Sequence, residues 1–114
     1  MNIVESTSAG APDVLTLTLS GRIDAGTTDS FAGALTACID RGERRLILDL
    51  AAVDYISSVG LRALILAAKR LAPLGGRIVL CAPQPRIRQL LDIAGFTSLF
   101  PIAASHDEAT ERMT

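Results

Sequence analysis

Two short, almost continuous apolar runs constrain the fold of this chain more than any other feature. They are Leu46-Ile47-Leu48-Asp49-Leu50 and Ile78-Val79-Leu80-Cys81-Ala82. Such runs are typical of central strands in a parallel sheet, because helices cover both faces of those strands. Between the runs, apolar residues at positions 61, 64, 65, 68 and 71 follow the period of an amphipathic helix. A strand, a helix and a strand at this spacing predict a right-handed crossover unit.

The N-terminal third of the chain predicts two strands and a helix. Residues 2–6 are a short extended candidate, and residues 14–19 alternate apolar side chains with threonine, which predicts one buried and one solvated face. Thr27 or Thr28 is expected to cap a helix that ends at Gly42. The apolar positions of this helix are Phe31, Leu35, Cys38 and Ile39.

The C-terminal third predicts a further helix, an edge strand and a final helix. Pro85 suits the first turn of a helix, and residues 99–102 are expected to form a short edge strand because they contain a proline. Residues 105–108, with the sequence Ser-His-Asp-Glu, match a capping box at the start of the last helix. We therefore expect one compact α/β domain over residues 1–114, with its core at about residues 13–110.

The composition limits the class of partner and the compartment. Lys and Arg number 11 and Asp and Glu 12, so the formal net charge of −1 gives no electrostatic reason to expect nucleic acid or an anionic membrane surface. The sequence contains neither a signal peptide nor an apolar stretch of the ~20 residues that a spanning helix needs. We expect a cytoplasmic protein without direct membrane insertion, in which Cys38 and Cys81 are reduced core residues.

The sequence offers little material for catalysis. His106 is the only histidine, and its place in a capping box predicts a solvated residue at a helix start. No serine or cysteine has an evident histidine partner, no residues cluster as metal ligands, and no glycine loop of the phosphate-binding kind is present. We therefore expect no enzymatic activity and no cofactor.

The most informative segment is residues 54–62, with the sequence Asp-Tyr-Ile-Ser-Ser-Val-Gly-Leu-Arg, which joins a predicted central strand to a predicted helix. Ser57 and Ser58 lie at the helix start, where a hydroxyl can cap a free backbone N–H group. The same position suits a phosphoserine, because the helix dipole and the free N–H groups favour negative charge. The local pattern alone favours the simple cap.

The chain as a whole resembles the STAS family, and within it the bacterial anti-sigma factor antagonists. The resemblance depends on residues 48–50, 53–61, 75–76, 83 and 91–95, and on residues 19–24, which match the family signature L-[ST]-G-x-[LIF]-D. It extends over residues 14–108 with the motifs in the correct order. It implies an α/β fold with a four- to five-stranded mixed sheet and helices packed mainly on one side.

The resemblance also implies a regulatory function. An antagonist of this family binds an anti-sigma factor that is also a serine kinase, is released when that kinase phosphorylates it, and is reset by a phosphatase. We expect such a switch, acting as a monomer. The alternative that the sequence leaves open is a standalone STAS subunit of a lipid-trafficking ABC transporter complex.

The family register places the phosphorylated residue at Ser58. The family motif D-S-[ST]-G-L has an aspartate where this chain has Ser57, which leaves Ser57 as the alternative acceptor. Val59 and Gly60 follow in the expected partner surface, and the absence of a side chain at Gly60 is expected either to admit a partner or to form a tight helix start. Two charged residues belong to the same expected surface. Asp24 either contacts the partner or caps its own turn. Arg62 lies one helical turn beyond Ser58. It binds a partner carboxylate, binds the phosphate, or is simply solvated.

Overall fold

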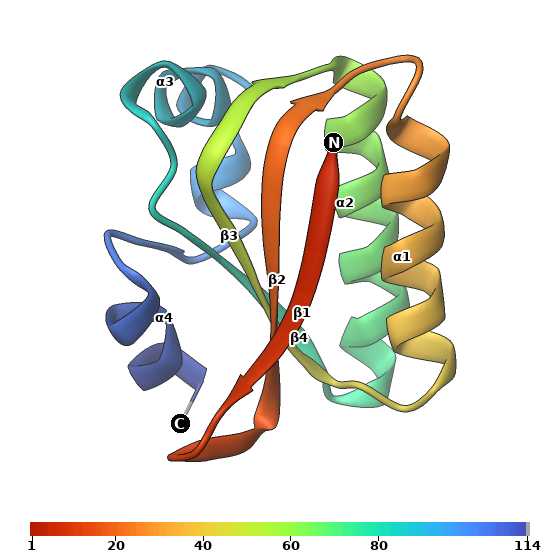
Figure 1. Cartoon of the computed structure of the whole chain (residues 1–114), viewed down its shortest axis with the longest axis vertical. Coiled ribbons are helices and arrows are strands. Elements are labelled where there is room, and N and C mark those ends of the chain that lie inside the picture. Colours follow the sequence, from red (N-terminus) through yellow and green to blue (C-terminus); the bar gives the residue numbers. More distant parts are fainter. Residues whose placement is uncertain (114) are drawn as a thin grey trace.

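A single five-stranded sheet organises residues 1–113, which are the residues described by the computed structural model (Figure 1). The strands are β1 (Asn2–Ser8), β2 (Ala11–Ile23), β3 (Arg45–Ile56), β4 (Arg77–Cys81) and β5 (Ile102–Ala103), and they lie in that order. β1 is antiparallel to β2, whereas the other neighbours are parallel. The predicted mixed sheet is therefore confirmed, with the two apolar runs in its central strands.

The helices are distributed unequally over the two faces of the sheet. They are α1 (Thr28–Asp40), α2 (Ser58–Leu71), α3 (Pro85–Ile93) and α4 (His106–Met113), with 3₁₀ turns at Ala72–Leu74 and Phe96–Ser98. α1 and α2 lie side by side on one face, and α4 lies on the other (Figure 1). The predicted packing of helices mainly on one side is confirmed.

Each face of the sheet has its own hydrophobic core. The larger core packs side chains from β2 and β3 against α1, α2 and α3, with Phe31, Leu48 and Leu64 almost completely buried. The smaller core lies under α4, where Ala109 and Met113 pack against β2, β3 and β4. Cys38 belongs to the larger core and Cys81 to the smaller. Both thiols are free and buried, as predicted, and burial raises the pKa of Cys81 to about 12.

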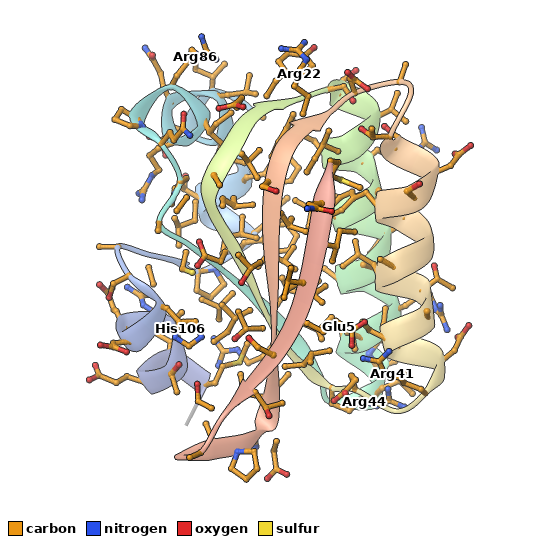
Figure 2. All side chains as sticks on the ribbon, viewed as in Figure 1. Glu5, Arg22, Arg41, Arg44, Arg86 and His106 are labelled. Atoms are coloured by element: carbon orange, nitrogen blue, oxygen red, sulfur yellow. The ribbon has the colours of Figure 1, made fainter. Side chains whose placement is uncertain are left out.

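The smaller core corrects two expectations. Thr16 lies on the face of β2 that was expected to be solvated, yet it is only 4% exposed because α4 covers it. Its hydroxyl lies 2.8 Å from Nε2 of His106, so a buried polar group is satisfied by the residue that begins α4. His106 is therefore a partly buried anchor of α4, not the solvated residue that the capping box predicted (Figure 2).

The last strand and the last helix differ slightly from the prediction. The expected strand at residues 99–102 is displaced, because Phe96–Ser98 forms a 3₁₀ turn and β5 begins only at Ile102. The capping box at α4 is present in modified form. The Ser105 hydroxyl accepts from the N–H of Glu108 at 3.2 Å, but the Glu108 carboxylate accepts from the N–H of Ala104, also at 3.2 Å.

Candidate functional site at the start of α2

The candidate site lies where β2 and β3 end together. Ile23 and Ile56 are paired in the sheet register, and the N–H of Ser57 donates to the Ile23 carbonyl at 2.8 Å. Asp24 and Ser57 directly follow this pair, so the sheet brings the turn before α1 next to the start of α2. Two segments separated by about thirty residues in the sequence thus meet at one end of the sheet, as the carboxyl ends of parallel strands do.

Ser57 and Ser58 have different environments. Ser57 is the N-cap of α2: its backbone is extended, with φ −78° and ψ 164°, and its hydroxyl accepts from the N–H of Gly60 at 3.1 Å. Ser58 is the first residue of the helix and is exposed. Its hydroxyl has no hydrogen-bond partner within the part of the chain that the structure describes. The Ser57 hydroxyl is therefore used in the cap, whereas the Ser58 hydroxyl is free among the described residues.

Gly60 faces the interior of the protein. A Cβ added there would lie 2.8 Å from Cγ2 of Ile23 and 3.3 Å from Cγ2 of Ile56. The first distance is too short for a carbon contact and the second is tight, so the glycine lets α2 begin directly against the ends of β2 and β3. The expectation that its missing side chain admits a partner is wrong, because the residue is buried and packs against the core. The alternative, a tight helix start, is confirmed.

Asp24 holds its own turn together. Its carboxylate accepts from the N–H of Gly26 at 3.0 Å, and it lies 3.3 Å from the Thr27 hydroxyl and 3.6 Å from Nε of Arg22. Hydrogen bonding to the Gly26 N–H is the main cause that lowers the pKa of Asp24, with smaller contributions from Thr27 and Arg22. The turn-capping role is confirmed, and its carboxylate still has 38% side-chain exposure. A contact with a partner stays a prediction.

The two threonines do not cap α1 as expected. Thr27 occupies the N-cap position, but its hydroxyl makes no capping bond to α1. It accepts from the N–H of Asp24 at 2.9 Å and donates to the Arg22 carbonyl at 2.8 Å. The Thr28 hydroxyl donates to the Asp24 carbonyl at 2.6 Å. Both hydroxyls therefore stabilise the turn that carries Asp24, which fixes this turn beside Ser57.

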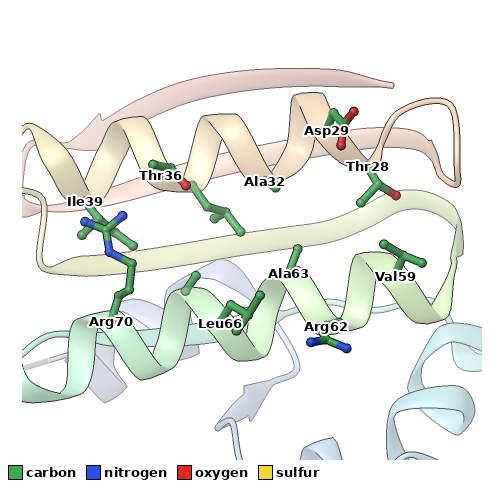
Figure 3. A pocket seen from close by; sticks show the side chains of 12 residues that line it. Thr28, Asp29, Ala32, Thr36, Ile39, Val59, Arg62, Ala63, Leu66 and Arg70 are labelled. Atoms are coloured by element: carbon green, nitrogen blue, oxygen red, sulfur yellow. The ribbon is translucent and has the colours of Figure 1, made fainter.

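Beyond Ser58, the first turn of α2 exposes an apolar side chain and a cation. Val59 is 55% exposed, and Arg62 is exposed without an ion-pair partner among residues 1–113. Both line a groove of about 320 Å³ between α1 and α2 (Figure 3). The structure thus places Val59 and Arg62 on one accessible surface that begins at Ser58.

A second apolar part of this surface was not predicted from the sequence. Tyr55, at the end of β3, is stacked under Arg22, whose guanidinium carbon lies 4.5 Å from the ring centroid. Tyr55 also lines a hollow of about 310 Å³ with Arg86 and Ile93 of α3, and Ile93 is 78% exposed. Figure 2 shows Arg22 and Arg86 at this same end of the sheet. Ile93 could have been noted in the sequence, because it falls outside the buried stripe of its helix.

The chemistry of this surface favours binding over catalysis. It joins exposed apolar side chains, a free serine hydroxyl and arginines, but no pair of a nucleophile and a base. The histidine lies elsewhere, bonded to Thr16 under α4. Within residues 1–113 no three His, Cys, Asp or Glu side chains gather as a metal site would require, and no helix is both long and apolar enough to cross a bilayer.

Comparison with known proteins identifies the family. The family model of the STAS domain matches residues 6–109. The chain belongs to the STAS family. The Bordetella bronchiseptica protein named "Putative anti-sigma factor antagonist BtrV" is 43% identical over 91 residues, which cover 80% of this chain and 78% of that protein.

Solved STAS structures have the same fold. An anti-sigma factor antagonist from Mycobacterium paratuberculosis is 26% identical, with a TM-score of 0.86 over 98% of this chain and 92% of that one. The antagonist SpoIIAA of Bacillus, at 18% identity, has been solved in an unphosphorylated form, with a TM-score of 0.72 over 97% of this chain and 96% of that one. Its phosphorylated form gives 0.75 over 99% and 100%. The relatives and the fold together support the function of an anti-sigma factor antagonist, a regulatory binding domain.

Proposed function

We propose that this STAS domain is a cytoplasmic switch that binds an anti-sigma factor with serine kinase activity through the surface around Ser58. In this proposal the unphosphorylated domain sequesters the anti-sigma factor, phosphorylation of Ser58 releases it, and a phosphatase restores the first state. The domain acts by binding and not by catalysis.

One observation carries the choice of Ser58 over Ser57. The Ser57 hydroxyl accepts the Gly60 N–H at 3.1 Å, so a phosphate on Ser57 would have to displace the cap. Ser58 is exposed, and its hydroxyl has no partner among the described residues. A kinase can reach this oxygen without disturbing the fold.

The surroundings of Ser58 support a change in binding rather than a change in shape. The first turn of α2 contains no acidic residue, so the positive end of the helix dipole is not offset by the chain itself. A phosphate would add nearly two negative charges there at neutral pH. The adjacent surface is apolar at Val59 and Tyr55, and a charge in such a contact costs binding energy because it must be desolvated.

The relatives support the same cycle. SpoIIAA, which shares this fold, has been solved in both unphosphorylated and phosphorylated forms. The Mycobacterium paratuberculosis and Bordetella bronchiseptica proteins both carry names that contain the words anti-sigma factor antagonist. By this likeness, the partner of the present chain is an anti-sigma factor.

The test begins with the Ser58→Ala variant as bait in lysate of the source bacterium, because this variant cannot be released by phosphorylation at that position. We expect recovery of a protein that mass spectrometry identifies as an anti-sigma factor with a kinase domain. The purified partner is then incubated with ATP and the domain. We expect it to phosphorylate Ser58 in the wild type and in the Ser57→Ala variant. Calorimetry should show that Ser58→Asp weakens its binding by about tenfold or more, whereas Ser58→Ala does not.

Three results would contradict the proposal in whole or in part. The first is recovery of no anti-sigma factor with the Ser58→Ala bait. The second is equal affinity of the purified anti-sigma factor for Ser58→Ala and Ser58→Asp. Phosphate found on Ser57 alone would move the switch by one residue and contradict the assignment to Ser58.

A further inference from the structure

α2 carries a second apolar stripe on its outer side, in addition to the stripe that faces the sheet. The inner stripe consists of Gly60, Leu61, Leu64, Ala67 and Leu71, all of which are buried. On the outer side, Val59 is 55% and Leu66 is 52% exposed, and Ala63 between them is half-buried. These positions have the spacing i, i+4 and i+7, which places them on one side of the helix. Ala63 also packs against the larger core, whereas Val59 and Leu66 remain more than half exposed.

The outer stripe forms one wall of the groove between α1 and α2. Ala32 and Thr36 of α1 belong to the opposite wall, and the volume is about 320 Å³ (Figure 3). At one end the groove is closed by an ion pair between Arg70 of α2 and Asp40 of α1, with 2.7 Å between Nη2 and Oδ1. The other end opens beside Ser58, because Val59 is the next residue along α2. The groove therefore ends at the first turn of α2, the turn that begins with Ser58.

The length of the groove fits a short helix. From Val59 to Arg70 the backbone of α2 rises by about 16 Å, or roughly three helical turns, at about 1.5 Å per residue. Small residues, Ala32 and Ala63, lie on both walls and permit close approach of a third helix. A helix that lies in a groove between two helices is a common way to recognise an amphipathic segment.

The charges at the open end determine the chemistry of that helix. Arg62 on the α2 side and Asp29 on the α1 side are both exposed, and neither has an ion-pair partner among residues 1–113. α1 and α2 run parallel, with both N-termini at the open end (Figure 1). The positive dipole end of α2, whose first turn has no acidic residue, favours the C-terminal end of a third helix there. A helix that runs antiparallel to both, with an acidic residue opposite Arg62 and a basic residue opposite Asp29, is complementary to this groove.

We propose that the groove between α1 and α2 binds an amphipathic helix, about three turns long, of the anti-sigma factor. Its apolar residues contact Val59, Ala63 and Leu66, and an acidic residue near its C-terminal end pairs with Arg62. This inference rests on the proposed function, because the partner is the same protein. It adds a second, extended contact to the one at Ser58, and it places a phosphate on Ser58 at the mouth of the groove, beside the acidic end of the bound helix.

Substitutions along the groove test this contact. The probe is the anti-sigma factor recovered with the Ser58→Ala bait, purified and titrated against variants of the full chain. Leu66→Arg should weaken binding by about tenfold or more, because it places a charge in the centre of the contact. Arg62→Glu should weaken binding severalfold. The matched control is Ala37→Arg, at an exposed position of α1 outside the groove, which should leave the affinity unchanged. Thermal unfolding of each variant verifies that the fold persists.

Cysteine footprinting gives a second measurement that does not depend on affinity. The native thiols are buried, so a single new cysteine reports only its own surroundings. A maleimide should label Leu66→Cys rapidly in the free protein and at least about tenfold more slowly in the complex, because an occupied groove excludes water and reagent. Ala37→Cys should react equally fast in both states.

The outcomes separate this inference from the proposed function. Unchanged labelling and affinity at position 66, with binding still weakened by Ser58→Asp, would overturn the groove contact and leave the switch intact. Slow labelling of Leu66→Cys without any partner, together with a dimeric mass in light scattering, would mean that a second copy fills the groove and would also overturn the inference. If the bait recovers no anti-sigma factor, both proposals fail.

Discussion

The starts of α2 and α4 have the same task, to satisfy the first N–H groups of a helix, and they accomplish it differently. α4 uses its own acids: Asp107 and Glu108 lie in its first turn, and Ser105 completes the cap. α2 has a serine cap at Ser57 but no acidic residue in its first turn. The positive end of the dipole is therefore offset by the chain at α4 and left open at α2.

The two starts also differ in how they contact the rest of the protein. α4 is anchored by a side chain, because His106 reaches Thr16 under the helix. α2 has no such anchoring side chain at Gly60, so its backbone packs directly against Ile23 and Ile56. The side chains at the start of α2 are thereby free for the surface. The start of α2 therefore has a positive dipole end without an acidic side chain and a free hydroxyl at Ser58. Both features suit the phosphate that is proposed on Ser58.

Gly60→Ala should have the largest effect on stability. The added Cβ would meet Cγ2 of Ile23 at 2.8 Å, so α2 must shift away from the strand ends. We expect a loss of about 2 kcal/mol in the free energy of unfolding, as for other overpacked sites, measured by urea denaturation. The matched control is Gly33→Ala in α1, where a Cβ would meet nothing within 4 Å, and this variant should gain up to about 1 kcal/mol. Equal stability of the two variants would show that the tight contact at Gly60 is not needed.

The Ser57→Ala and Ser58→Ala variants should differ in their free energy of unfolding. Removing the Ser57 cap should cost about 1 kcal/mol, whereas Ser58→Ala should change stability by less than about 0.5 kcal/mol. Ser105→Ala should resemble Ser57→Ala, because both hydroxyls accept an N–H three residues on. Chemical denaturation of the three variants measures these differences. A larger cost for Ser58 than for Ser57 would reverse the assignment of cap and free hydroxyl.

The anchor of α4 should contribute less than the cap. Thr16→Val removes the hydroxyl from the bond to His106 while it keeps the shape of the side chain. We expect a loss of about 0.5–1 kcal/mol, the usual net value of one hydrogen bond, because the partly exposed imidazole can bind water instead. A double-mutant cycle of Thr16→Val with His106→Ala measures the coupling. Independent, additive effects would mean that the bond contributes nothing to stability.

The features predicted correctly from the sequence were those expressed in local patterns. The apolar runs gave the central strands, the 3.6-residue period gave α2, and Ser105 with Glu108 gave the start of α4. The sequence placed both Ser57 and Ser58 at the helix start. Only the hydrogen bond from the Gly60 N–H shows that Ser57 is the cap.

What could not be predicted depends on contacts between distant segments. Thr16 and His106 are ninety positions apart, and no local pattern shows that α4 covers that part of β2. Gly60 faces the interior because its backbone packs against Ile23, which belongs to β2 and is distant in sequence. Tyr55 and Ile93 became part of one surface only because α3 packs at the end of β3. The candidate site was therefore located by sequence, but its shape was not.

The smallest expected effect concerns Asp24, in the turn that lies beside the start of α2. Its carboxylate is used by its own turn, where the Gly26 N–H is the main cause of its lowered pKa. Because the folded pKa is below the unfolded value of 3.8, the turn bond adds stability above about pH 4, and this contribution is lost as the pH falls through the folded pKa. Asp24→Asn should remove that part of the acid dependence and leave stability near pH 7 only slightly lower, since the group is exposed to solvent. Carboxyl-carbon NMR titration of Asp24, with urea denaturation at pH 3 and pH 7, measures both effects. A normal pKa for Asp24 would mean that its carboxylate does not accept the Gly26 N–H in solution, and the turn beside Ser57 would then lack this bond.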